Sequence, residues 1–313
     1  MSVRILVGDV RDKLADLEDE SVHCVVTSPP YWGLRDYGVV GQIGLEPDFR
    51  DYIATMVDVF REVRRVLRRD GTLWLNLGDT YATRPYGDRH TFDPKYNGRV
   101  RASGYPNRSG PQNGVKHKDL LGMPWRVAFA LQEDGWWLRQ DIIWSKPNPM
   151  PESVTDRCTK AHEYLFLLSK SAKYYYDAKA ILENCSENSH GSPNVNPGKK
   201  NVVREDGGSL GRWTETDKKN GRNKRSIWAV ATQPFAGAHF AAFPPALVEP
   251  CILAGCPVGG TVLDPFGGAG TTGLVADRLG RNAILIELNP EYAEMARRRI
   301  ERDAGLFAKV AAD

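Results

Sequence analysis

Thr261-Val-Leu-Asp-Pro-Phe-Gly-Gly-Ala-Gly-Thr-Thr-Gly273 is the stretch of sequence that decides the fold. A short apolar run enters a glycine-rich turn, and the residues after it predict a helix from Gly270 to Leu279. Glycines let a ligand approach the backbone closely, and the free N–H groups of a helix start favour a carboxylate or a phosphate. The stretch therefore predicts a strand, a ligand-binding turn and a helix, as found in α/β sheets.

Two acidic residues indicate which ligand this turn binds. Asp264 precedes the glycines, where an ammonium could sit, and Glu287 follows Gly268 by 19 residues, where it could accept from ribose hydroxyls. The glycines also satisfy the GxGxxG pattern of dinucleotide-binding dehydrogenases, which is weak alone. A dinucleotide fold needs further strands after the acidic residue, and only 26 residues follow Glu287, so a dinucleotide is disfavoured. S-adenosylmethionine fits the turn better, because it carries a carboxylate, an ammonium and ribose hydroxyls.

Apolar runs elsewhere predict seven strands that alternate with helices. This pattern favours an α/β fold with one doubly wound, mostly parallel sheet and helices on both faces. Asp70-Gly71 predicts the end of a helix that begins near residue 47, and Pro250 predicts a kink or a late start in its helix. The expected strands are 3–7, 22–27, 72–76, 141–144, 163–168, 261–264 and 283–287; the expected helices are a short one after Asp9, then 47–69, 124–134, 247–255, 270–279 and 290–302.

A second turn, Ser28-Pro29-Pro30-Tyr31, ends the predicted strand 22–27. Two prolines lack N–H donors, so carbonyls at this turn are left without local partners. The Ser28 hydroxyl and the Ser28 or Pro29 carbonyl form an acceptor-rich pocket that suits an exocyclic NH2 group. Tyr31 offers a face on which a base can stack, worth about 1–3 kcal/mol. The alternative is a proline-terminated strand with an ordinary surface tyrosine.

The composition is that of a globular chain whose charge is unevenly distributed. The chain has 313 residues, of which 41% are hydrophobic and 26% are charged. This composition excludes a disordered tail, a collagen-like rod and a coiled coil. No apolar run reaches the roughly 18 residues of a membrane span. The five cysteines contain no CxxC pair, so we expect neither a disulfide framework nor a metal site. The net charge is +3, yet residues 82–120 and 196–226 each carry +5, which fits a polyanion-binding surface or two solvated insertions.

Together the two turns resemble those of a known family. Thr27-Ser-Pro-Pro-Tyr-Trp32 and Asp264-Pro-Phe-Gly-Gly-Ala-Gly-Thr-Thr272 are similar to the motifs of amino-methylating DNA methyltransferases, which use S-adenosylmethionine. The catalytic turn comes first and the cofactor turn last, as in the circularly permuted β class of that family. Serine before Pro-Pro-Tyr resembles the cytosine-N4 subgroup. The adenine-N6 subgroup, which more often has aspartate or asparagine there, is the alternative.

The resemblance implies a role for individual residues. It assigns catalysis to Ser28, Pro29, Pro30 and Tyr31, and it places the adenine amino group of the cofactor on Asp9. The implied cofactor-binding residues are Asp9, Phe240, Phe243, Asp264, Phe266, Gly268, Gly270, Thr271 and Glu287. Double-stranded DNA is expected to bind the basic residues Arg84, Arg89, Arg99, Arg101, Arg108, Lys116, Lys199, Lys200, Arg212, Arg222, Lys224 and Arg225.

The resemblance also implies an organisation of the chain and a reaction. We expect residues 1–183 to form the catalytic part, with the insertion 82–120, residues 184–226 a target-recognition insertion, and residues 227–313 the cofactor-binding part. The expected reaction moves a methyl group to N4 of a flipped cytosine, in the cytoplasm of a prokaryote near its nucleoid. A homodimer and a cognate restriction endonuclease are open as partners. RNA or protein amino-methylation and non-catalytic DNA binding are more distant alternatives. Apart from the resemblance, the charge run from Arg297 to Arg299 predicts a solvated helix face, with DNA contact as the alternative.

Overall fold

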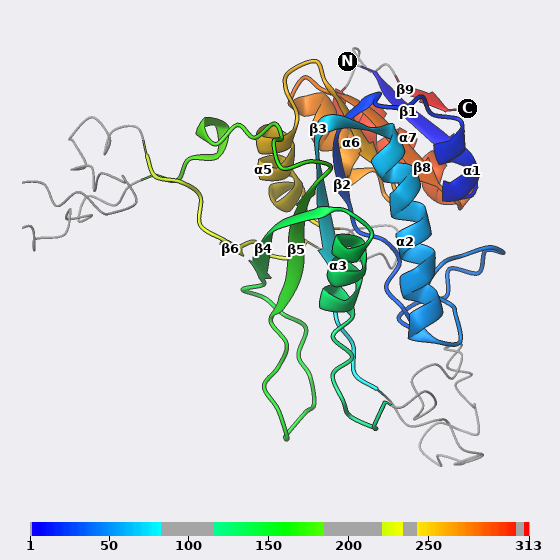
Figure 1. The fold of residues 1–313 in the computed structure, drawn as a ribbon, viewed down its shortest axis with the longest axis vertical. Coiled ribbons are helices and arrows are strands. Elements are labelled where there is room, and N and C mark those ends of the chain that lie inside the picture. Colours follow the sequence, from blue (N-terminus) through cyan, green and yellow to red (C-terminus); the bar gives the residue numbers. More distant parts are fainter. Residues whose placement is uncertain (1, 83–114, 185–220, 234–242, 305–309, 313) are drawn as a thin grey trace, which may run out of the picture. The chain divides into compact units, whose positions relative to one another are not determined.

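The computed structural model describes residues 2–82, 115–184, 221–233, 243–304 and 310–312. The chain divides into two compact units, one of residues 1–176 with 226–313 and one of residues 177–225. The described part of the smaller unit contains a 3-10 helix, η2 (Lys179–Ile181), and a β-bridge between Glu183 and Arg222. The larger unit contains a nine-stranded sheet in the order β6-β4-β5-β3-β2-β7-β8-β1-β9 (Figure 1).

The strands and helices of the larger unit follow the sequence pattern closely. The strands are β1 (Val3–Val7), β2 (Val22–Thr27), β3 (Leu67–Leu77), β4 (Trp137–Ser145), β5 (His162–Ser169), β6 (Ile227–Ala229), β7 (Thr261–Asp264), β8 (Asn282–Glu287) and β9 (Val310–Ala312). The helices are α1 (Val10–Ala15), α2 (Phe49–Val66), α3 (Met123–Glu133), α5 (Pro245–Gly255), α6 (Thr271–Arg278) and α7 (Pro290–Ala304).

The predicted fold class is confirmed, whereas the predicted number of strands is wrong. All neighbouring strands run parallel except β5, which lies antiparallel between β3 and β4. The two additional strands, β6 and β9, have three residues each and pair with β4 and β1. Three residues are too few to show the alternation that identifies a strand in sequence.

Several predicted helix boundaries were also wrong by two or three residues, and two of these differences have a clear local cause. Helix α2 ends at Val66 rather than 69, because Leu67 adopts an extended backbone and enters β3 directly. Helix α5 starts two residues earlier than predicted and continues through Pro250. Its first residue is Pro245, where a helix needs no N–H donor, so proline starts this helix early instead of delaying it.

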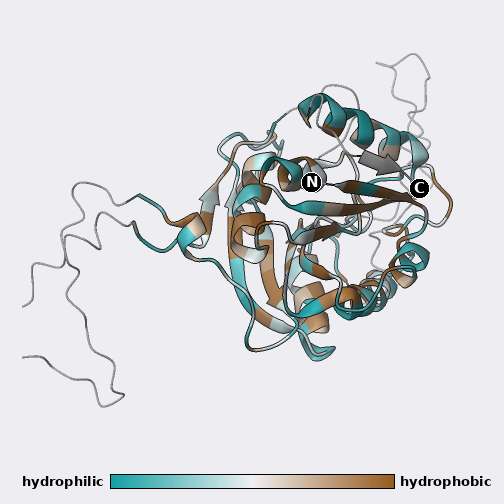
Figure 2. Ribbon diagram, turned by 90° about the horizontal axis from the view of Figure 1, so that it is seen from above, coloured by the Kyte–Doolittle hydropathy of each residue, from teal (hydrophilic) through white to brown (hydrophobic). Residues whose placement is uncertain are grey.

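Helices cover both faces of the sheet. Helix α2 is capped by Asp48, whose side chain accepts from the Arg50 N–H, and it buries Met56 and Phe60 fully. It packs with α1 and α3 on one face, while α5, α6 and α7 pack on the other. Figure 2 shows hydrophobic strands between helices whose outer sides are hydrophilic. Among the described helices, none is both long and apolar enough to cross a bilayer.

The strand order brings the two sequence motifs to one edge of the sheet. Strands β2, β7, β8 and β1 are consecutive neighbours and run parallel, so their carboxyl ends lie together. The chain leaves β2 for β3 through α2 and leaves β7 for β8 through α6, on the opposite face. Connections that diverge in this way leave a crevice at the carboxyl edge, where α/β sheets bind ligands.

Candidate active site

A cavity of about 150 Å³ lies at this carboxyl edge. Both motifs line it, because Ser28 and Pro30 face the same space as Phe266, Gly268 and other turn residues. Its wall is formed by Gly8, Asp9, Val10, Ser28, Pro30, Tyr37, Val39, Gly41, Gln42, Ile43, Phe243, Pro265, Phe266, Gly267, Gly268, Ala269, Thr271, Ile286, Glu287, Leu288, Asn289 and Tyr292. The two turns, more than 230 residues apart in the chain, thus form one site.

The glycine turn is held by its own backbone and by helix α7. Gly270 has a φ of +74°, and a Cβ there would lie 2.8 Å from the Ala296 Cβ, so only glycine fits. The Arg299 guanidinium donates to the Ala269 carbonyl and to the Thr271 hydroxyl, each at 2.9 Å. The prediction of a solvated helix face is therefore wrong for Arg299, because its guanidinium is hydrogen-bonded to the glycine turn.

Glu287 lies in the cavity with both carboxylate oxygens engaged by backbone. One oxygen accepts from the Gly268 N–H at 2.8 Å and the other from the Asn289 N–H at 2.9 Å. Burial raises the pKa of this carboxyl group, and the backbone donors oppose that rise. Each oxygen keeps a further lone pair, which can accept from a ligand hydroxyl.

Asp264 is hydrogen-bonded to residues beside both turns. It is not among the residues that line the cavity. Its carboxylate accepts from the Thr27 hydroxyl and from the Thr272 hydroxyl, both at 2.7 Å, and from the Phe266 N–H at 3.1 Å. Its residue is 1% exposed, and burial raises its pKa to about 6 despite these hydrogen bonds. The side chain thereby connects the strand end before Ser28 with the first turn of α6.

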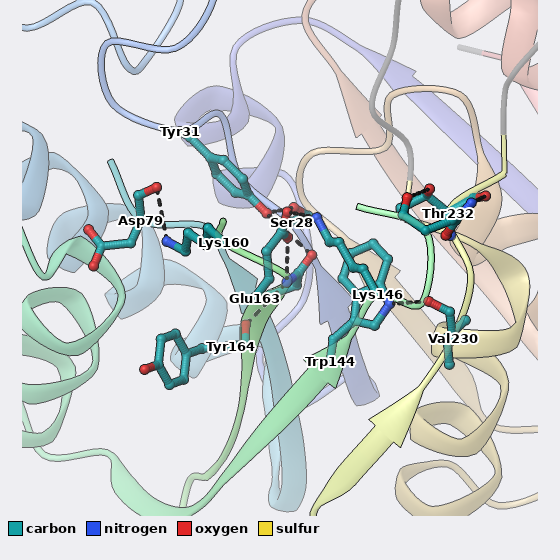
Figure 3. A network of polar contacts seen from close by, with 12 residues as sticks. Ser28, Tyr31, Asp79, Trp144, Lys146, Lys160, Glu163, Tyr164, Val230 and Thr232 are labelled. Atoms are coloured by element: carbon teal, nitrogen blue, oxygen red, sulfur yellow. Dashed lines mark hydrogen bonds and ion pairs between the residues drawn. The ribbon is translucent and has the colours of Figure 1, made fainter. Parts of the chain in front are cut away.

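Tyr31 is not among the residues that line the cavity, and its hydroxyl belongs to a polar network (Figure 3). Its ring packs on Gly78, where an added Cβ would lie 2.5 Å from the ring. Its hydroxyl donates to Glu163 at 2.7 Å and lies 3.3 Å from the Ser28 hydroxyl. Burial and the Glu163 charge raise the pKa of Tyr31 well above its usual value.

Glu163, Lys146 and Asn76 complete this network and were not predicted from the sequence. Glu163 accepts from the Lys146 ammonium and, at 3.1 Å, from the Asn76 amide. The Lys146 ammonium also lies 4.4 Å from the centre of the Trp144 ring. One signal was available: Asn76 and Glu163 are polar residues at the ends of the predicted apolar strands 72–76 and 163–168.

The remaining predicted cofactor residues are placed as follows. Asp9 lines the cavity, caps α1 and pairs with the Arg11 guanidinium, which lowers the pKa of Asp9. Phe243 lines the cavity just before α5, and Phe240 lies outside the described residues. The segment from Tyr37 to Ile43, which the sequence did not identify, supplies five further lining residues.

Most of the predicted DNA-binding residues lie outside the described residues, namely Arg84, Arg89, Arg99, Arg101, Arg108, Lys199, Lys200 and Arg212. Lys116 is exposed and lies 3.9 Å from Asp119. Within the smaller unit, Arg222 and Arg225 both pair with Glu183, at 3.3 and 3.0 Å. Lys224 is adjacent to Arg225 in the sequence, and it is partly buried.

Comparisons with known proteins identify the family to which this chain belongs. A family model described as DNA methylase, of the N6/N4 methyltransferase type, matches residues 22–298. The Type II methyltransferase M.SmaI of Serratia marcescens is 50% identical over 96% of this chain and 91% of its own. M.Cfr9I of Citrobacter freundii, also a Type II methyltransferase, is 46% identical over 97% of this chain and 90% of its own.

Solved structures show the same sheet. A putative DNA modification methylase of Thermus thermophilus, crystallised with S-adenosylmethionine, matches with a TM-score of 0.62 and 25% identity over 99% of both chains. The PvuII methyltransferase, described as cytosine-N4-specific, matches with a TM-score of 0.64 and 20% identity over 97% of this chain and 90% of that one. The chain therefore belongs to the N4/N6 amino-methylating DNA methyltransferases, Type II enzymes that take their methyl group from S-adenosylmethionine.

Proposed function

We propose that this enzyme methylates the N4 amine of cytosine in duplex DNA. The observation that carries the proposal is that Ser28, at the head of the Pro-Pro-Tyr turn, shares one cavity with Gly268 and Glu287. A serine at this place resembles the cytosine-N4 subgroup. The similar PvuII enzyme, described as cytosine-N4-specific, contributes likeness of fold alone at 20% identity.

The lining residues fit S-adenosylmethionine. Glu287 has acceptor lone pairs for ribose hydroxyls, and the start of α6 at Thr271 offers backbone N–H groups to a carboxylate. Phe243, Phe266 and Ile286 supply apolar walls for the adenosine, and Asp9 an acceptor for its amino group. When bound, the cofactor supplies an electrophilic methyl group on its sulfonium.

Asp264 is assigned an indirect role in this proposal. Its carboxylate is enclosed by Thr27, Thr272 and Phe266, so it favours a bound ammonium through its charge rather than through a lining contact. Its hydrogen bonds also fix the distance between the two turns. Loss of this side chain is therefore expected to weaken cofactor binding through the shape of the turn.

The Ser28 turn is assigned to the target amine. The Pro30 carbonyl accepts from the Tyr52 hydroxyl at 2.9 Å, which leaves the acceptor role to Ser28 and the Pro29 carbonyl. Acceptors that hold the amine hydrogens favour charge on the nitrogen as it attacks, and one such fixed contact contributes about 3 kcal/mol. The cytosine must leave the duplex to reach this turn, at a cost of a few kcal/mol.

The remaining assignments concern DNA and partners. The basic insertion 184–226, which separates the catalytic residues 1–183 from the cofactor-binding residues 227–313, is proposed to read the target sequence. Residues 82–120, an insertion within the catalytic part, are proposed to hold the phosphate backbone. The relatives' Type II names favour a cognate restriction endonuclease as the functional partner in a prokaryotic cytoplasm. The oligomeric state, monomer or homodimer, can be measured by light scattering.

The test is methylation of mixed-sequence duplex DNA with isotopically labelled S-adenosylmethionine, followed by nucleoside mass spectrometry. N4-methylcytosine is the expected product. N6-methyladenine would refute the choice of base while keeping the reaction class. Label in RNA or protein but not in DNA would refute the substrate, and the Ser28→Ala variant, expected to lose most transfer, serves as the control for the site.

A further inference from the structure

We propose that Glu163 receives the proton released by the methylated amine, passed to it through Ser28 and Tyr31. The inference rests on the proposed function, because it places the target amine at Ser28. It assigns a task to a carboxylate that does not line the cofactor cavity. Glu163 is thus a positioning residue that acts through the Pro-Pro-Tyr turn.

Three oxygen atoms form a chain from the cavity into the protein. The Ser28 hydroxyl, on the cavity wall, donates to the Tyr31 hydroxyl at 3.3 Å. The Tyr31 hydroxyl donates to Glu163 Oε2 at 2.7 Å. Because an ionised carboxylate can only accept, Tyr31 must be the donor to it, so the Tyr31 oxygen is available to accept from Ser28. The hydrogen bonds that join these three residues (Figure 3) therefore all donate in one direction, from Ser28 on the cavity wall to Glu163.

The groups around Glu163 hold its carboxylate group in place. The Lys146 ammonium of β4 contacts its Oε1, and the Asn76 amide of β3 donates to its Oε2 at 3.1 Å. A second cation, Lys160, lies on the side of Asp79, to whose carbonyl it donates at 3.1 Å. Side chains of Lys146 and Glu163 are only 19% and 16% exposed, so water screens this ion pair weakly.

The proton balance of methylation needs such an acceptor. The amine nitrogen forms a bond to the methyl carbon, the carbon–sulfur bond breaks, and its electron pair stays on sulfur. The nitrogen then carries one proton too many. Ser28 takes this proton as it gives its own to Tyr31, and Tyr31 gives its own to Glu163, which becomes neutral.

The amine, the Tyr31 hydroxyl and the Glu163 carboxylate each suit this proton transfer. A protonated exocyclic amine on an aromatic ring holds its proton weakly, so a carboxylate is a sufficient acceptor. Burial and the neighbouring carboxylate raise the pKa of Tyr31, so this hydroxyl stays neutral and passes protons without holding a negative charge. After turnover, Glu163 returns its proton to solvent beside the partly exposed Lys146.

The first test compares Glu163→Gln with Glu62→Gln, a matched change on the outer face of α2. Glutamine keeps an acceptor for Tyr31 but cannot take a proton. The single-turnover methylation rate of Glu163→Gln is expected to fall about 100-fold, the usual size of a lost acid–base contribution. The dissociation constants for S-adenosylmethionine and DNA, measured without turnover, should stay within about twofold, and Glu62→Gln should match the wild type.

A rate for Glu163→Gln within about threefold of wild type would overturn the relay. If Ser28→Ala is impaired in the same assay, the proposed function stands and only the relay fails. If Ser28→Ala is also unimpaired, both fail. Should Glu163→Gln not fold, Tyr31→Phe decides, because it keeps the ring on Gly78 and removes the hydroxyl; it must lose rate similarly.

Rescue by a conservative change separates the role of the ion pair from mere support of the turn. Lys146→Met keeps an aliphatic chain on Trp144 and removes the cation that contacts Glu163. The single-turnover rate of Lys146→Met should fall while the dissociation constant for S-adenosylmethionine stays within about twofold, and Lys146→Arg should restore the rate. A Lys146→Met variant with the wild-type rate would contradict the role of this ion pair in the relay.

Discussion

Replacement of Asp264 by asparagine is expected to change how stability depends on pH. In the folded protein burial raises the pKa of Asp264 to about 6, against an ordinary value of 3.8 in the unfolded chain. Between these values the folded state holds a proton that the unfolded state has released. The free energy of unfolding therefore contains a contribution that is full below pH 3.8 and is lost as pH rises through about 6.

The size of this contribution follows from the two pKa values. A difference of roughly two units corresponds to about 3 kcal/mol, since each unit is worth about 1.4 kcal/mol. The protonated side chain can donate to the Thr272 oxygen while Thr272 donates to the Val26 carbonyl, 3.3 Å away. An asparagine amide can make the same donation at every pH, so it should fit without losing hydrogen bonds.

The assay is urea unfolding, followed by tryptophan fluorescence, of wild type and Asp264→Asn between pH 4 and pH 7. The variant should gain about 3 kcal/mol relative to wild type across this range. Asp58→Asn, an exposed change on α2, provides the background. Parallel curves for wild type and Asp264→Asn would refute the reasoning. Saturating S-adenosylmethionine should shrink the difference, because a bound cation favours the ionised carboxylate.

Three further changes test the site. Tyr31→Ala should reduce methyl transfer at least about tenfold while sparing cofactor binding; wild-type turnover would remove Tyr31 from catalysis. Gly270→Ala should destabilise the fold by about 2–4 kcal/mol, more than Gly122→Ala, which shares a positive φ but has open space around its Cβ; equal losses in thermal unfolding would exclude the contact with Ala296. Glu287→Gln should weaken S-adenosylmethionine binding about tenfold by calorimetry, and an unchanged constant would argue against a ribose contact.

The sequence predicted the parts of the molecule that depend on local pattern. The apolar run from Thr261 to Asp264 predicted a strand, which the structure contains. The glycines after it predicted a turn, because glycine adopts backbone conformations that other residues avoid. The meeting of this turn with Ser28 also followed, because parallel strands end at the same edge of a sheet. Short edge strands such as Ile227–Ala229 carry no such pattern and form only by pairing with a neighbour.

The polar network was beyond the sequence for a different reason. Glu163 contacts Tyr31 across 132 positions and Asn76 across 87, so nothing local joins them. Likewise, Asp264 carries a carboxylate of the expected type, yet its contacts with Thr27 and Thr272 depend on how β2 and α6 pack around β7. Local pattern identifies chemical groups, and only tertiary structure decides which of them touch a ligand.

A crystal structure of the enzyme with a non-reactive S-adenosylmethionine analogue and a short target duplex tests the central claim most directly. The account predicts the methyl-equivalent atom of the analogue between the Gly268 turn and the Ser28 turn, with the N4 amine of an extruded cytosine in line with it. A complex that holds the analogue in another cavity, or the target amine away from Ser28, would contradict the account.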